Sequence, residues 1–411
     1  MVSAVPRFDK PAERLAGAPA RRRVCMFVTN TVSIDVRVTK EAATLAEAGH
    51  EVTVLGLADH DLPAEESLEG FRVRRLRPDT LRTPARGVRR ALTPLRSAWA
   101  LLDYSWRALR VATAERFDVY HAHDLVTLPV AWAARARRGG RLVYDAHELF
   151  TEMARLDAVS RRFFRALEAL LIGRADRVVT VNDSIAAELA RRYRVRPPLV
   201  VRNCPRTFGR RHDRSQSTLR DRARVPGGTP VVLYQGLYLP HRGLENLVRA
   251  AGLFARAHLV LMGWGPLRDP LRRLAEETGL AGRVTFIDPV PQGDLLAVTA
   301  GADLGVIPYR NVGLNNFYTS PNKLYEYCAA GVPVVASRFP ELVKVVEGLA
   351  LGRTFDPDDP ASIAAAVDAL VEDPAELARV RMGAAAAADR FTWEREGRLL
   401  LDAYEALPAG A

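Results

Sequence analysis

The sequence predicts an α/β protein made of two doubly wound parallel-sheet domains that face a cleft. Short apolar runs alternate with helical patterns along almost the whole chain, and strand–helix–strand order of this kind implies parallel strands with right-handed crossovers. A polar, arginine-rich stretch bounded by proline and glycine at 204–228 divides this alternation into two series. The 411 residues suffice for two cores.

The first series begins with an apolar strand at 24–30. A helix at 38–49 follows, and the next strand is predicted at 50–57. Four further strands are predicted at 117–123, 141–147, 176–182 and 198–203.

The second series has helical segments between its strands. Its predicted strands are 230–236, 257–263, 283–288, 302–309 and 332–337. One helix is expected over about 321–330, with Ser320 as the N-cap and Pro321 at the first helical position. The region 360–408 is helical and ends in an amphipathic helix at 391–407.

The same patterns give domain boundaries. Residues 1–22 lack the apolar stretch of a secretory signal and are predicted to be a disordered tail. The first domain is placed at 23–205, a linker at 206–228 and the second domain at 229–391.

Composition narrows the classes of partner. The net charge is +11, and no apolar run approaches the roughly 18 residues that span a bilayer. Because no RNP, zinc-finger or heptad pattern accompanies the positive charge, nucleic acid is not an expected partner. The widely spaced Cys25, Cys204 and Cys328 fit neither a disulfide framework nor a zinc site, which indicates buried thiols in the reducing cytoplasm.

The stretch TSPNKLYEYCAAGVPVVAS at 319–337 predicts an anion site. The start of its helix offers free N–H groups and a positive dipole end, with Lys323 beside them. Glu326, one turn further, is placed to accept hydrogen bonds from the two hydroxyls of a ribose. The alternative is a surface Lys–Glu pair. The helix start and its position at the cleft edge favour a nucleotide.

Two further strand–helix junctions of the second domain have a ligand-binding character. A strand ends at Gly236, and Arg242 lies where a diphosphate would meet the next helix. Gly263 and Gly265 follow another strand. The alternatives are an ordinary loop with a surface arginine and a tight turn.

Histidines and carboxylates end two strands of the first domain. His121 and His123 alternate along one strand and therefore share a face, and Asp124 follows them. His147 and Glu148 end the next strand. A metal site, a sugar-binding histidine and a buried structural histidine all remain open, and the sugar contact is favoured over the metal.

Asp35 and Arg37 follow the first strand, where a ligand of this fold would lie. The alternative for Asp35 is to cap the helix that begins near Val36.

These motifs resemble the retaining glycosyltransferases of the GT-B fold, family 4 (glycosyl transferases group 1). The resemblance covers nearly the whole chain from about residue 23 and rests on SPNKLYEYCAAGVPVVAS, the YQG and HRGLENLVRA junction, ADLGVIPY and the terminal FTWE helix. It implies two Rossmann-like domains, the acceptor side first and the donor side second, with a helix at 392–411 that crosses back to the first domain.

The resemblance also implies the reaction. A sugar moves from a nucleotide-linked donor, UDP-linked rather than GDP-linked, to an acceptor hydroxyl with retention of configuration and without a metal ion or other cofactor. The acceptor class stays open between a glycan, a lipid-linked compound and a small molecule.

Roles follow residue by residue. His123 matches the histidine that contacts the donor sugar, Arg242 matches the residue that contacts the diphosphate, and Lys323 lies nearby; these three are the expected catalytic residues. Glu326 matches the second glutamate of the family's E-x7-E motif, which binds the ribose. The expected nucleotide-binding set is Gly236, Arg242, Gly263, Gly265, Ser320, Asn322, Lys323 and Glu326. The acceptor-side candidates are Asp35, Arg37, Asp124, His147 and Glu148.

Two positions depart from the family. Tyr318 stands where the first glutamate of E-x7-E is expected, and Leu237 stands where a basic residue usually follows the strand. Both departures leave a non-catalytic nucleotide-sugar-binding relative as an alternative. A second alternative is a GT-B epimerase or hydrolase that uses His123, Asp124 and Glu148 as its acid and base.

The segment 81–112 is a candidate for peripheral membrane contact. It contains seven arginines and one acid, and Trp99, Leu102 and Trp106 follow helical spacing. A basic amphipathic helix of this kind lies on an anionic bilayer, here at the inner membrane face. The alternative is a helix packed on its own sheet with a solvated basic face.

Overall fold

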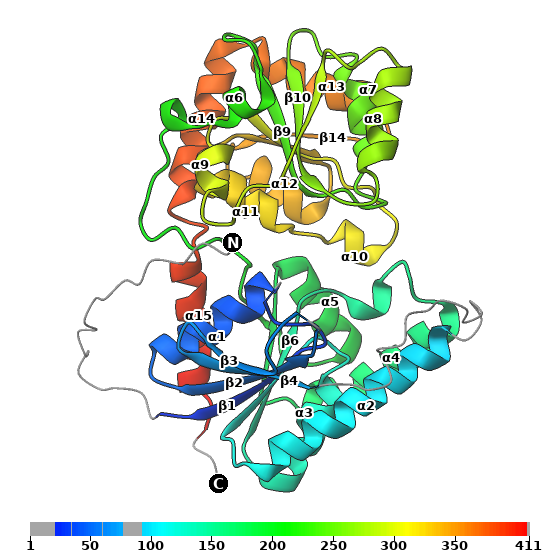
Figure 1. The fold of residues 1–411 in the computed structure, drawn as a ribbon, viewed down its shortest axis with the longest axis vertical. Helices are drawn as coiled ribbons and strands as arrows, with labels where there is room; N and C mark the ends of the chain where they lie inside the picture. Colours follow the sequence, from blue (N-terminus) through cyan, green and yellow to red (C-terminus); the bar gives the residue numbers. More distant parts are fainter. Residues whose placement is uncertain (1–20, 34, 60, 77–92, 409–411) are drawn as a thin grey trace.

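The computed structural model shows two α/β domains, drawn one above the other in Figure 1. Of the predicted tail at 1–22, residues 1–20 lie outside the described part of the chain. Arg22 belongs to the first domain instead, because its guanidinium donates to the carbonyl of Leu407 at 2.6 Å. The structure describes residues 21–33, 35–59, 61–76 and 93–408.

The first domain alternates strands and helices from its first residues. Its elements are β1 (Arg23–Phe27), α1 (Val36–Glu47), β2 (Glu51–Leu57), β3 (Glu65–Leu68), β4 (Phe71–Leu76), α2 (Thr93–Ala114), β5 (Val119–His123), α3 (Leu128–Arg138), β6 (Arg141–Ala146), η3 (Phe150–Glu152), α4 (Ala158–Leu171), η4 (Ile172–Arg174), β7 (Arg177–Thr180), α5 (Asp183–Tyr193) and β8 (Leu199–Val200).

These strands form one sheet in the order β3-β4-β2-β1-β5-β6-β7-β8, parallel throughout except that β3 runs antiparallel to β4. The helices α2, α3, α4 and α5 share one apolar cluster on one face of the sheet, and α1 packs in the cluster on the other face. Both faces are therefore covered, as parallel sheets require.

The sequence did not predict β3 and β4. Phe71 and Val73 of β4 are buried, but Arg72, Arg74 and Arg75 break the apolar run between and after them. A strand with one partly exposed face shows alternation rather than a continuous apolar stretch.

The second domain follows the same pattern. Its elements are η5 (Arg214–Gln216), α6 (Leu219–Ala223), β9 (Val231–Leu237), α7 (Leu244–Ala251), β10 (His258–Trp264), α8 (Arg268–Glu277), β11 (Val284–Ile287), α9 (Leu295–Thr299), β12 (Leu304–Ile307), α10 (Leu314–Phe317), α11 (Asn322–Ala329), β13 (Val334–Ser337), α12 (Pro340–Val346), β14 (Gly352–Phe355), α13 (Pro360–Val371) and α14 (Pro374–Ala388).

Its sheet is parallel, in the order β11-β10-β9-β12-β13-β14. Every strand predicted from the sequence is present in one of the two sheets, with ends that differ by a few residues. The sequence did not predict β14. Within the segment expected to be a linker, α6 contributes Leu219 and Ala223 to the core of the second domain.

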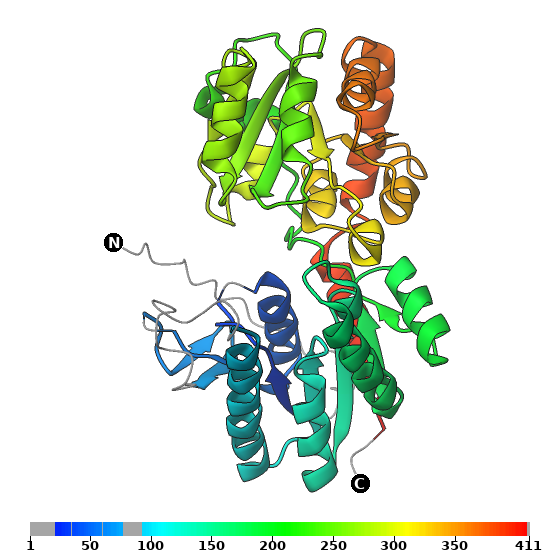
Figure 2. The same cartoon turned by 90° about the vertical axis from the view of Figure 1, so that its right-hand side faces the viewer.

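The last helix, α15 (Trp393–Glu405), crosses back to the first domain as predicted. Figures 1 and 2 show it, in red, running along the first domain after the chain leaves the second. The indole N–H of Trp393 donates to the hydroxyl of Thr44 at 2.8 Å, and Trp393, Leu400 and Tyr404 belong to the apolar cluster of α1. This packing joins α15 to α1 in the first domain.

Among the residues that the structure describes, none of the helices has both the length and the apolar character needed to cross a bilayer.

Candidate active site

A cleft of about 940 Å³ lies between the two domains. Both domains contribute to its walls, at the carboxyl ends of their strands, where doubly wound folds bind ligands. Its polar lining residues include His147, Glu148, Asn182, Gln235, Gly236, Arg242, Tyr309, Asn315, Ser320, Asn322, Lys323 and Glu326.

The start of α11 faces this cleft. Pro321 is the N-cap, and no side chain caps the helix. The predicted N-cap role of Ser320 was therefore wrong, because its hydroxyl instead accepts a hydrogen bond from the amide of Asn182 at 2.9 Å, across the domain boundary. Ser320 and Asn322 both line the cleft. The first N–H groups of the helix are thus left without a side-chain cap at a cleft wall.

Two cations converge on Tyr309 in this wall. Lys323 is buried, and its ammonium donates to the Tyr309 hydroxyl at 2.7 Å. The guanidinium of Arg242 lies over the Tyr309 ring, 4.1 Å from its centre. Burial alone would raise the pKa of Tyr309, but Lys323 and Arg242 outweigh burial and lower it. The three side chains therefore form a positively charged site beside the start of α11.

Glu326 lies one helical turn beyond Lys323. Its carboxylate accepts a hydrogen bond from Gln235 at 2.6 Å, and the Gln235 carbonyl accepts one from Thr299 at 2.8 Å. Burial raises the pKa of Glu326, while Gln235 and Lys323 oppose that rise. Lys323 and Glu326 are thus not an exposed ion pair. The carboxylate of Glu326 is held at the cleft wall by Gln235, which belongs to strand β9 of the sheet.

Gly236 lines the cleft, whereas Gly263 and Gly265 do not, although their neighbour Trp264 does. At Gly263, with φ of 155°, a Cβ would lie 1.9 Å from the carbonyl oxygen of Gly236. This glycine is therefore required by the close approach of β9 and β10. Direct contact of Gly263 and Gly265 with a nucleotide stays a prediction.

On the opposite wall, His147 is held between two carboxylates. Its Nε2 lies 3.2 Å from Asp145, its Nδ1 lies 3.6 Å from Asp124, and its backbone N–H donates to Asp124 at 3.1 Å. Burial alone would lower the pKa of His147, but Asp124 and Asp145 raise it to about 10. His147 therefore presents a positive charge to the cleft at neutral pH.

Glu148, beside His147, also lines the cleft. Its carboxylate accepts from the side-chain amide of Asn315 at 2.9 Å, and Asn315 accepts from the N–H of Leu149 at 2.9 Å. Since Asn315 belongs to α10, these bonds connect the two domains. Burial and the nearby Asp124 raise the pKa of Glu148.

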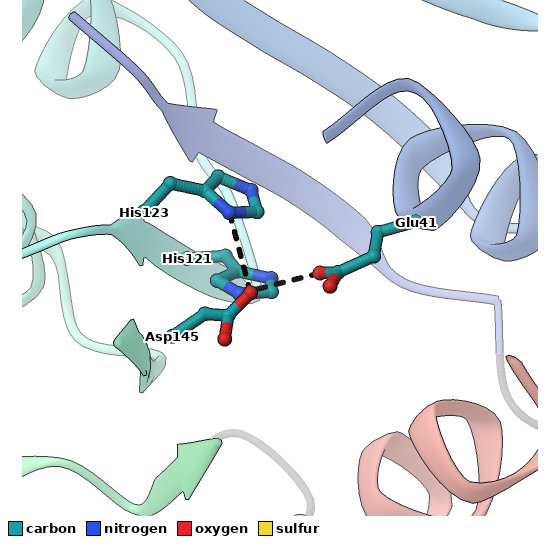
Figure 3. Close-up of side chains that lie close together, drawn as sticks. All are labelled: Glu41, His121, His123 and Asp145. Atoms are coloured by element: carbon teal, nitrogen blue, oxygen red, sulfur yellow. Dashed lines mark ion pairs between the residues drawn. The ribbon is translucent and has the colours of Figure 1, made fainter. Parts of the chain in front are cut away.

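Behind this wall lies a buried cluster of Glu41, His121, His123 and Asp145, drawn in Figure 3. The imidazoles of His121 and His123 stack with centres 4.4 Å apart, as strand alternation predicted. One atom of each of the four residues lies within 4.8 Å of the others, which is a spacing that could hold a metal ion.

A cation of the protein itself already neutralises this cluster. The guanidinium of Arg37 donates to both oxygens of Asp145, at 2.8 and 2.9 Å, and lies 3.0 Å from Glu41. It supplies the positive charge that these buried carboxylates need. Burial and the charge of Asp145 raise the pKa of Glu41 to about 8. The predicted acceptor contact of Arg37 is not supported, because its guanidinium is used within the fold.

The remaining first-domain candidates lie off the cleft. Asp35 caps α1 by accepting from the N–H of Val38 at 3.1 Å. His123 is buried, with its Nδ1 3.1 Å from Nε2 of His147. Neither residue lines the cleft, and neither does Asp124. The role of His123 at the donor sugar stays a prediction.

Several cleft residues were not predicted from the sequence. Tyr309 ends a predicted strand, and its position between two cations depends on long-range packing. Asn182 and Asn315 act across the domain boundary, which no local pattern reveals. Of the two departures from the family, Leu237 lines the cleft, while Tyr318 packs against the core of the first domain.

Comparison with known proteins identifies the family. One family model, a glycosyl transferase 4-like domain, matches residues 34–205, and a second, glycosyl transferases group 1, matches residues 215–389. A D-inositol 3-phosphate glycosyltransferase of Saccharomonospora viridis is 31% identical over 315 residues, which cover 71% of each chain. The chain belongs to the family 4 glycosyltransferases. A D-inositol 3-phosphate glycosyltransferase of Salinispora tropica is 29% identical over 399 residues, 90% of this chain and 80% of that one.

Solved structures show the fold of the chain. Sucrose-phosphate synthase from Thermosynechococcus elongatus has a TM-score of 0.77 at 22% identity and covers 94% of this chain and 99% of its own. Anabaena HepE, in complex with UDP and glucose, has a TM-score of 0.72 at 18% identity over 94% of this chain and 100% of its own. The predicted GT-B fold is confirmed, and the protein is a glycosyltransferase.

Proposed function

We propose that this glycosyltransferase takes its sugar from a nucleoside diphosphate sugar, UDP-linked, and transfers it to an acceptor hydroxyl with retention of configuration. One observation carries the proposal: Lys323 and Arg242 converge on Tyr309 in the cleft wall beside the start of α11. A diphosphate is the part of such a donor that two fixed cations and free helix N–H groups bind best.

Glu326 extends this site from phosphate to ribose. It lies one turn beyond Lys323, and its carboxylate is oriented by Gln235. A fixed carboxylate at this distance suits the two vicinal hydroxyls of a ribose. The UDP in the HepE structure makes uridine the first nucleoside to test.

The reaction needs stabilisation of the charge that develops on the leaving diphosphate. Arg242 and Lys323 would supply it from fixed positions, so little reorganisation is needed as the glycosidic bond breaks. Because these cations neutralise the diphosphate, we propose that transfer proceeds without a divalent metal. Retention is proposed from the family resemblance.

The acceptor side of the cleft would be formed by His147 and Glu148. Glu148 accepts from Asn315 of the other domain, and its pKa is raised by burial, which favours a carboxyl group that can exchange a proton with a hydroxyl. The acceptor is a hydroxyl compound, and D-inositol 3-phosphate, after which the relatives are named, is the water-soluble candidate to include in the test.

We place the enzyme in the cytoplasm. Cys25, Cys204 and Cys328 are all buried free thiols, as expected in a reducing compartment. We further propose that α2 brings the enzyme to the inner membrane face; residues 81–92 of the predicted contact lie outside the described residues.

A donor panel tests the proposed reaction. Purified enzyme is incubated with UDP-, GDP- and ADP-sugars in EDTA, with and without acceptor candidates, and the released nucleoside diphosphate and the anomeric form of the product are measured. Acceptor-dependent release from a UDP-sugar is expected. Donor turnover without acceptor would instead indicate an epimerase or hydrolase, and nucleotide binding without any turnover would indicate a non-catalytic relative.

A further inference from the structure

The outer face of α4 is strongly apolar. Val159, Phe163 and Leu170 are 76%, 61% and 56% exposed, which is unusual for side chains of this size in one helix. The helix nevertheless has an inner face, since Leu171 is buried and Leu167 packs against the core. The exposed side chains are therefore additional to those that fold the domain.

The charge that α4 itself carries on this face has one sign. Arg162 is exposed beside Phe163, whereas the exposed Arg165 pairs with Glu152 of η3 at 2.5 Å. The single acid of the helix, Glu168, is buried and accepts hydrogen bonds from Tyr144 and Tyr193, both at 2.7 Å. The residues of α4 therefore present apolar groups and positive charge to the outside.

The described part of α2 repeats this character. Trp99, Leu102 and Trp106 are 59%, 63% and 55% exposed. Arg110 is also exposed, and its guanidinium lies over the Trp106 ring, 4.8 Å from its centre. As in the predicted alternative, α2 packs on its own sheet through Tyr104, Ala108 and Ala112, but its outer surface also carries these large exposed apolar side chains.

The two helices belong to one layer of the first domain. Both pack on the same apolar cluster, and α3 contacts each of them. Figure 1 labels them on the same side of the lower domain, and Figure 2 presents that side to the viewer. The apolar and basic side chains of α2 and α4, which we call the α2–α4 face, therefore cover one side of the first domain.

The α2–α4 face continues to the cleft. Met153, Ala154 and Arg155 line the cleft, and α4 begins three residues later at Ala158. A molecule whose polar end is in the cleft could thus keep an apolar tail at this face.

We propose that the α2–α4 face docks on an anionic lipid bilayer and that a lipid of this bilayer carries the acceptor hydroxyl. This inference rests on the proposed transfer reaction and names its acceptor class. The occupant follows from the charge, because a second copy of the chain would place arginines against arginines. Acidic headgroups pair with them instead, while tryptophan and phenylalanine suit the interfacial region.

Vesicle flotation tests the docking. The full chain is mixed with phosphatidylcholine vesicles that contain or lack phosphatidylglycerol, at low and high salt. We expect binding to the anionic vesicles only, weakened by salt, and a loss of roughly fivefold in partitioning for each arginine removed, such as Arg162→Gln. The double variant Trp106→Glu/Phe163→Glu should lose binding by more than tenfold.

Met382 of α14, in the second domain, provides the matched control. Its side chain is 68% exposed, so Met382→Glu makes the same change away from the α2–α4 face and should bind vesicles as the wild type does. Equal binding of the double variant and this control would overturn the docking. A double variant that binds vesicles normally but differs from the wild type in oligomeric state, measured by light scattering, would also overturn the docking.

Two further readouts separate this inference from the proposed function. The double variant should bind UDP as the wild type does. A wild type that binds vesicles but does not bind UDP would refute the proposed reaction and leave the docking intact. Labelled sugar from the donor should appear in the organic phase of reactions that contain membrane lipids. Label found only on water-soluble acceptors would overturn the lipid acceptor.

Discussion

Arg242→Ala would remove one of the two cations proposed to hold the donor diphosphate. The guanidinium lies 4.1 Å from the centre of the Tyr309 ring, and Lys323 donates to the hydroxyl of the same tyrosine. The substitution leaves Lys323 in place, so it halves the fixed charge at the site without removing the site. The side chain lines the cleft and is only half-buried, so the fold should tolerate its loss.

The size of the effect follows from the kind of interaction that the substitution removes. A hydrogen bond to a charged group contributes about 1.5–3 kcal/mol. At about 1.4 kcal/mol per factor of ten, kcat/KM should fall by roughly 10- to 150-fold. Because the charge on the diphosphate grows as the glycosidic bond breaks, kcat should fall as well as KM rise.

The assay is the initial rate of UDP release with acceptor, at several donor concentrations. Arg249→Ala is the matched control, since Arg249 is an exposed arginine on α7, the helix that follows Arg242. Both variants should unfold at the temperature of the wild type. An Arg242→Ala enzyme within twofold of the wild type, or one no slower than Arg249→Ala, would refute the assignment of the diphosphate site.

Three further substitutions test the surroundings of the cleft by urea unfolding. Asp145→Asn should lose about 3 kcal/mol, the lower end for a broken buried ion pair, since Glu41 still lies 3.0 Å from the buried Arg37. Gly263→Ala should lose roughly 2–6 kcal/mol, because its Cβ would overlap the neighbouring strand at an unfavourable φ. The loss of stability caused by His147→Gln should be largest below about pH 6.5 and small near pH 10. The pKa of His147 is raised to about 10 in the folded protein, so its stabilising charge is complete at low pH and is lost as the pH rises through that value.

Each of these variants has a comparison. Asp358→Asn breaks an exposed ion pair and should change the unfolding free energy by about 0–1 kcal/mol. Gly282→Ala adds a methyl group with nothing within 4 Å and should be close to neutral. If Asp145→Asn or Gly263→Ala matched its control, the packing assigned to Arg37 or to β9 and β10 would be incorrect. If the difference in unfolding free energy between His147→Gln and the wild type did not change with pH, His147 would not carry the charge assigned to it between Asp124 and Asp145.

The sequence was a sound guide to the sheet and helix order because parallel strands buried on both faces are continuous apolar runs. It failed at β4, where the exposed Arg72 and the buried Arg75 both interrupt the apolar run. It also assigned Ser320 as an N-cap from local chemistry, although the hydroxyl is engaged by Asn182 of the other domain.

The candidate site was predictable where local pattern and position coincide. Lys323, Glu326 and Arg242 line the cleft as expected. The sequence could not distinguish His123 from His147, since both end strands beside carboxylates. Only the packing of the sheet shows that the first is buried and that the second reaches the cleft.

The most direct test of the central claim is calorimetric titration of UDP into the wild type, Lys323→Met and Arg242→Ala in the presence of EDTA. Saturable binding at one site per chain is predicted for the wild type, weakened by roughly tenfold or more in each variant. UDP binding that is unaffected by either substitution, or that occurs only when a divalent metal is added, would contradict the claim that these two cations hold the donor diphosphate.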